Sequence, residues 1–346
     1  MKKAGQVSVS LGLTLLIGYI FYRAVPDWGH ALSVMVRGRP AFLLVGLGFA
    51  LLHMVLRAIR WGVLLAPVKR NIALRNLFSL TLVKYVINII PPRTGEVVAS
   101  ILLARKERIS AASVIAASLL ERILDTGTVV VMFGAYLVWF SQWYPAVSER
   151  GTKILQAVRS FSIKGFVVLC ILFLILAWLL RSKQWTERIP PRIRKYLLLF
   201  LEGFRALQQG GALAKTLALS VAIWMVITCQ VWFMVQAYLP HFPFTGSLFL
   251  MCVTVVGIAI PTPGGVGGYQ IFMNVVLVNF FSNYLAASDP NSQAAGISNG
   301  CYLVSMVPVI LIGLGFLYRE GLSLGQVSQI SEQEEKQRPP TSLSPK

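Results

Sequence analysis

The chain has 346 residues, of which 56% are hydrophobic and only 13% are charged, a composition that excludes an ordinary soluble globular protein. Lys and Arg number 32 against 13 Asp and Glu, which gives a net charge of +19. Most of the basic residues lie in short loops beside apolar runs. The charge therefore indicates membrane topology and attraction to anionic headgroups, and no nucleic-acid partner is expected.

Apolar runs along the chain are of two lengths. Six are long enough to cross a bilayer, at 7–25, 41–56 (with a continuation to 65 left open), 110–140, 163–180, 213–239 and 294–318. Two pairs are shorter, 77–90 with 97–104 and 247–260 with 271–281, and each pair is joined by a turn rich in proline and glycine. Such interrupted segments predict re-entrant hairpins. The expected fold class is an all-α polytopic membrane protein with six full spans and two re-entrant helical hairpins.

Loop charge predicts the orientation. Loops 57–75, 105–108 and 181–209 are basic and should be cytoplasmic, whereas loops 239–246 and 282–293 lack Lys and Arg and should lie outside. Loops 23–40 and 141–162 carry some basic residues and fit this rule less well. Both termini are then cytoplasmic.

Two halves with the same order of segments follow from this assignment. Each half, about 7–140 and 163–318, crosses the membrane an odd number of times, so the halves form an inverted repeat. They make one domain, 1–320, with a basic amphipathic linking segment at 181–209. The polar tail 321–346 is expected to be disordered.

The run 110–140 carries ionisable residues near its middle, which is costly at membrane depth and indicates a functional site. Glu121 and Asp125 are one helical turn apart, with Ser118 and Thr128 extending the same face. Arg122 is three residues from Asp125. The sequence predicts one polar stripe on an apolar helix.

The first hairpin tip, from Asn88 to Glu96, carries one positive and one negative residue, Arg93 and Glu96, just after Pro91-Pro92. Arg93 has the planar fork that clamps a phosphate. Alternatively, Glu96 pairs with Arg122, and Arg93 with Glu121 or Asp125, in an ion network that braces the hairpin. The two interpretations are compatible, and both stay open at this point.

The second tip, Pro261 to Gly268, is rich in glycine. Amide groups around Gly264, Gly265 and Gly267 could hold an anion at a helix N-terminus. The alternative is a tight turn in which glycine permits close packing.

Basic residues near the predicted span ends have simpler interpretations. Lys84 is expected to extend to the membrane interface rather than to contact phosphate. Arg57 and Arg60 are expected to anchor the cytoplasmic end of the second span. The four cysteines and three histidines are isolated, so neither a metal nor a cofactor is expected.

Together these motifs resemble the lysylphosphatidylglycerol synthase transmembrane-region family over about residues 10–320. The resemblance rests on the first tip (Asn88 to Glu96), on Ser110 with Glu121, Arg122 and Asp125, and on the second tip (Pro261 to Gly267). It implies a flippase-like membrane domain linked to lipid translocation or envelope-lipid modification. Ala99 and Gln270 depart from the family pattern, which often has Arg and Glu there. No aminoacyl-transferase domain is expected, because only a short tail follows Tyr318.

The expected function is an inner-membrane lipid flippase that binds an anionic or modified envelope lipid. Two alternatives stay open: a membrane enzyme acting on lipid phosphates, and a non-catalytic partner of a lipid-modification enzyme. No catalytic residue is proposed. The candidate headgroup-binding residues are Lys84, Asn88, Arg93, Glu96, Glu121, Arg122, Asp125, Gly264, Gly265 and Gly267.

Overall fold

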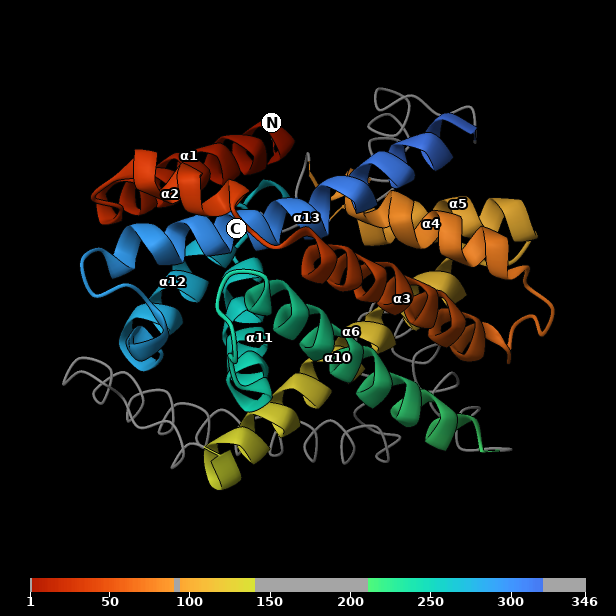
Figure 1. Ribbon diagram of the computed structural model, residues 1–346. Helices are drawn as coiled ribbons and strands as arrows, with labels where there is room; N and C mark the ends of the chain where they lie inside the picture. Colours follow the sequence, from red (N-terminus) through yellow and green to blue (C-terminus); the bar gives the residue numbers. More distant parts are fainter. Residues whose placement is uncertain (1, 90–93, 141–210, 320–346) are drawn as a thin grey trace, which may run out of the picture.

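The computed structural model describes residues 2–89, 94–140 and 211–319. Every regular element in these ranges is a helix (Figure 1), which confirms the all-α prediction for this part of the chain. Arg93, the span 163–180, the segment 181–209 and the tail 321–346 lie outside the described residues. In chain order the helices are α1 (Lys2–Ala24), α2 (Trp28–Val36), α3 (Pro40–Leu65), α4 (Leu74–Ile87), α5 (Gly95–Glu107), α6 (Ala111–Ala135), η1 (Tyr136–Phe140), α10 (Ala212–Gln236), α11 (Phe244–Ile258), η3 (Pro263–Gly265), α12 (Gly268–Phe280), η4 (Ser282–Tyr284) and α13 (Pro290–Arg319).

Within the described ranges, three helices are long and apolar enough to cross a membrane: α3, α10 and α13. Helix α6 matches α10 in length at 25 residues, but three charged residues lie near its middle. Helix α3 runs through Arg57 and Arg60 without a break and ends at Leu65. The second predicted apolar segment therefore continues as one helix to Leu65.

The region between the first two predicted spans contains an extra helix, α2. Asp27 begins it, because its side chain accepts a hydrogen bond from the His30 amide at 3.0 Å. Helix α2 packs against α13 (Figure 1), and a Cβ on Gly296 of α13 would meet Val34 at 2.8 Å. This short connection is thus part of the packed bundle.

Two helical hairpins are built on close glycine contacts. Helix α4 packs on α5, and α11 packs on α12. A Cβ on Gly95 would come within 2.8 Å of the Asn88 side-chain oxygen, and closer still to the Lys84 carbonyl. A Cβ on Gly257 would meet the Gly268 backbone at 2.7 Å. Only glycine permits such close approach of the two hairpin arms.

Packing contacts occur in matching pairs. Helices α3 and α10 lie side by side at the centre (Figure 1). Around them, α3 packs on α4 as α10 packs on α11, and α5 packs on α6 as α12 packs on α13. Helix α4 also packs on α13, as α11 packs on α6. Helices α3 to α6 and α10 to α13 therefore share the same order of neighbour contacts.

Connections gather at two opposite ends of the bundle. At one end, Lys69 after α3 bonds Glu107 at the end of α5 at 2.6 Å. At the other end, the Asp27 amide donates to Ser292 at 2.9 Å, and the Arg39 amide donates to the Ala237 carbonyl at 3.0 Å. Loops predicted for the same side of the membrane thus lie together.

Candidate functional site

Helix α6 presents its acidic residues to the interior of the bundle. Asp125 and Glu121 are 7% and 6% exposed, because one helical turn places both on the face toward α3. Arg122 lies on another face, and its side chain is 61% exposed. The predicted single stripe is therefore divided into an inner acidic pair and an outer arginine.

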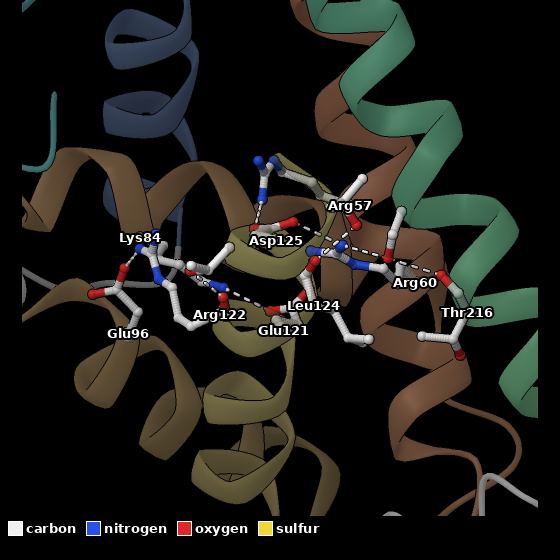
Figure 2. A network of polar contacts seen from close by, with 12 residues as sticks. Arg57, Arg60, Lys84, Glu96, Glu121, Arg122, Leu124, Asp125 and Thr216 are labelled. Carbon is white, nitrogen blue, oxygen red and sulfur yellow. Dashed lines mark hydrogen bonds and ion pairs between the residues drawn. The ribbon is translucent and has the colours of Figure 1, made fainter. Parts of the chain in front are cut away.

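Asp125 is held by two arginines from α3 (Figure 2). Arg57 donates to one carboxylate oxygen at 2.7 Å, and Arg60 donates to the other at 2.8 Å. Arg60 also donates to the Ser220 hydroxyl of α10 at 3.0 Å. These charge-assisted bonds join three helices inside the bundle.

The prediction that Arg57 and Arg60 anchor the end of a span is wrong. Arg60 is fully buried, and the Arg57 side chain is 16% exposed. Each has a carboxylate partner, which is how buried charges are usually tolerated. One sequence signal could have indicated these partners: Arg57 and Arg60 are three residues apart and therefore share a helical face, as Glu121 and Asp125 do on α6.

Lys84 is also inside the bundle, so the prediction that it extends to the membrane interface is wrong. Its side chain is 12% exposed, and its ammonium nitrogen lies 3.3 Å from Glu121. The same nitrogen lies 4.5 Å from the centre of the Trp61 ring. Arg60 approaches the other Glu121 oxygen at 3.7 Å, so Glu121 lies between two cations.

The first hairpin tip joins this cluster from the outer side. Glu96 binds Arg122, as the bracing interpretation predicts. Asn88 holds the tip closed: its side-chain oxygen accepts from the Gly95 amide at 2.8 Å, and its nitrogen donates to Glu96 at 3.3 Å. The structure therefore brings together Lys84, Asn88, Glu96, Glu121, Arg122 and Asp125.

The glycine-rich second tip favours the tight-turn alternative. Gly264, Gly265 and Gly267 all have positive φ angles, which glycine adopts without strain. The Gly267 amide donates to the side chain of Gln270 at 2.7 Å, and the Gly265 amide donates to the Thr262 carbonyl at 3.0 Å. Two amides considered for anion binding are thus engaged within the loop, and Gln270 has a structural role.

Metal chemistry finds no support in the part of the chain that the structure describes, since no group of three His, Cys, Asp or Glu side chains could hold an ion there. The carboxylates of the cluster are already bound by Arg, Lys or Asn side chains. What the arrangement can do is bind charge inside an apolar helix bundle.

Fold and site together define an α-helical integral membrane protein with an ion cluster inside its helix bundle. A family model described as "Lysylphosphatidylglycerol synthase TM region" matches residues 6–313. The chain therefore belongs to this family, which connects it with membrane-lipid modification. No curated protein and no solved structure showed significant similarity to it.

Proposed function

We propose that the chain is a lipid transporter of the flippase type in the inner membrane, and that it takes up the headgroup of an anionic lipid. The observation that carries the proposal is the ion cluster on α3, α4, α5 and α6. It combines four cationic side chains with three acidic ones among the described residues: Arg57, Arg60, Lys84 and Arg122 with Glu96, Glu121 and Asp125. Charges inside a membrane bundle are costly and by default functional.

The division of the cluster suits headgroup capture. Arg122 is the exposed member and would meet an arriving headgroup first. Its bond to Glu96 ties it to the first hairpin, so contact with a headgroup would compete with that bond. The inner pairs around Asp125 and Glu121 would receive the charge as it moves inward.

The matching packing pairs support the inverted repeat and the re-entrant hairpins. In an inverted repeat, α3 and α10, which pack against each other, would lie beside the axis that relates the halves, and α4–α5 would correspond to α11–α12. Rocking one half against the other would expose the cluster to each side in turn, as in other inverted-repeat transporters. Basic residues beside the Lys69–Glu107 pair support a cytoplasmic assignment for that end.

The inner carboxylates of the cluster are already bound by cationic side chains, which favours transport over an enzymatic reaction on lipid phosphates. A general base must reach a proton on the reacting group. Asp125 accepts bonds from two guanidinium groups, and Glu121 lies between Arg60 and Lys84. Neither is oriented as a base.

Reconstitution tests the proposal. The purified protein is placed in liposomes containing acyl-labelled fluorescent phosphatidylglycerol or phosphatidylcholine, and a membrane-impermeant reductant quenches the outer-leaflet label. We expect protein-dependent exposure of the inner-leaflet anionic lipid, faster than that of the zwitterionic lipid. Equal quenching in protein-free liposomes would contradict the proposal. Phosphate release from a lipid would favour the enzyme alternative, and stable co-purification of a lipid-modifying enzyme without transport would favour the partner alternative.

A further inference from the structure

The inner part of the cluster has more positive than negative charge. Among the described residues, Arg57, Arg60 and Lys84 pair with two carboxylates, those of Glu121 and Asp125. The side chains of these five residues are between 0% and 16% exposed. The outer Arg122–Glu96 pair is neutral and does not change the balance. One buried positive charge is therefore uncompensated among the described residues.

The same region contains buried donors that make no hydrogen bond to the described residues. They are Nε of Arg57, Nε and one Nη of Arg60, and the indole nitrogens of Trp61 and Trp224. That Arg60 Nη lies 3.7 Å from a Glu121 oxygen, which is an ion-pair distance but too long for a hydrogen bond. Arg60 and Trp61 are fully buried, and Trp224 is 5% exposed. A buried donor without an acceptor costs free energy. The missing partner of these five donors is an acceptor. Nδ1 of His53 and Oε1 of Gln230, on α3 and α10, also make no hydrogen bond to the described residues, so the inventory of these two helices is dominated by donors without consisting of donors alone.

Aromatic rings border the donors. Lys84 lies over the Trp61 ring, and the Arg57 guanidinium lies 5.6 Å from the centre of the Trp224 ring. Apolar surroundings of this kind lower the local dielectric constant and strengthen the attraction between the excess cation and an incoming anion. The charge balance and the donor inventory point to the same kind of ligand.

We propose that this inner cluster, between α3, α4, α6 and α10, is a binding site for a phosphate group, carried by a lipid or free in solution. Several tetrahedrally arranged oxygens suit guanidinium forks and scattered N–H donors better than a single halide does. The inference deepens the proposed function and rests on it for the lipid source of the phosphate. It assigns roles to Arg57 and Arg60 that the sequence analysis missed.

A set of charge-changing variants, called the charge cycle below, tests the site. Lys84→Gln makes the inner cluster neutral, Glu121→Gln adds a second uncompensated charge, and the double variant returns to the original balance. The measurement is the rise in unfolding temperature of the detergent-purified full chain with added sodium phosphate or phosphatidylglycerol, compared with sodium chloride at equal ionic strength. A ligand that binds only the folded protein raises that temperature.

We expect phosphate affinity to fall about tenfold or more in Lys84→Gln and to rise by a similar factor in Glu121→Gln, since one unit charge changes at close range. The double variant should return toward the wild-type affinity. If Glu121→Gln proves too unstable to purify, Arg57→Gln repeats the charge change of Lys84→Gln and must also weaken binding.

The chain supplies a matched control at the end of the bundle. Lys69→Gln and Glu107→Gln remove the same charges from another Lys–Glu pair, which is joined at 2.6 Å. Neither should change the response to phosphate.

The outcomes separate the site from the transport function. The site is supported if the rise in unfolding temperature with sodium phosphate, with phosphatidylglycerol or with both changes across the charge cycle as expected. The probe that produces this rise identifies the source of the phosphate. An equal response to chloride, or a response unchanged across the cycle, overturns the site. Phosphate binding without lipid movement in liposomes would contradict the transport proposal and leave the site standing; lipid movement without phosphate binding would do the reverse.

Discussion

Single residues explain why this bundle tolerates charge. Sequence reasoning identified the acids of α6, because Glu121 and Asp125 interrupt an apolar run. It missed their main partners, because Arg57 and Arg60 follow a run that is already long enough to span the membrane. Charges at such positions usually mark the end of a span. Only the tertiary packing of α3 against α6 reveals that both arginines face inward.

Asp125 carries the first stability prediction. In Asp125→Asn, fully buried Arg60 loses its closest charged partner, and breaking a buried pair from one side costs about 3–5 kcal/mol. Thermal unfolding in a fixed detergent should show the loss.

Asp27→Asn is the matched control, because Asp27 is exposed and Asn serves equally well as a helix N-cap. An Asp125→Asn protein as stable as this control would show that Asp125 is not the counter-ion of the arginines.

At the scale of elements, the sequence predicted two helical hairpins but neither helix α2 nor the role of Gly257. Gly95 lies close to Pro91-Pro92 at the turn between two apolar runs, which is the pattern of a helical hairpin, whereas Gly257 lies inside an apolar run where nothing distinguishes it. Helix α2 is only nine residues long, and its stability comes from Asp27 and from packing on α13, which a single-sequence pattern does not reveal.

Gly95→Ala tests the close contact in the first hairpin. The new methyl group would overlap the Lys84 carbonyl and Asn88, so the two arms must separate. We expect a loss of about 1–3 kcal/mol in thermal unfolding.

Gly127→Ala in α6 is its control, because no atom lies within 4 Å of the new Cβ and alanine favours helix by about 0.5–1 kcal/mol. Equal effects at the two glycines would mean that the hairpin does not depend on close backbone contact.

The beginning of α13 predicts a dependence on pH. Burial opposes ionisation of Asp289, but bonds from Ser292 and His30 outweigh it and lower the pKa of Asp289 below its ordinary value of 3.8. The ionised carboxylate therefore contributes its full stabilisation above about pH 3.8, and the contribution is lost as the pH falls through the lowered pKa.

Asp289→Ala should cost about 1 kcal/mol at neutral pH, because it removes a helix cap and the contact between the carboxylate and the His30 ring. Unfolding curves at decreasing pH should show this difference shrinking below the ordinary pKa. A difference that stays constant into that acidic range would contradict the assignment.

At the scale of the whole molecule, the described helices pack in pairs around α3 and α10. The inverted repeat of the two halves stays a proposal, which these paired contacts support. Composition alone could not show that the ion cluster would form between the first hairpin and α3, because this depends on how helices distant in sequence meet.

In the proposed function, the ion cluster receives an anionic lipid headgroup and passes it across the membrane. The most direct measurement compares phosphatidylglycerol movement in liposomes by the wild-type protein, Arg122→Gln and the control Arg75→Gln, whose arginine is exposed outside the cluster. We expect Arg122→Gln to slow phosphatidylglycerol movement about tenfold or more, because the exposed cation is lost, and Arg75→Gln to leave the rate unchanged. Equal rates for all three proteins would contradict the proposed function.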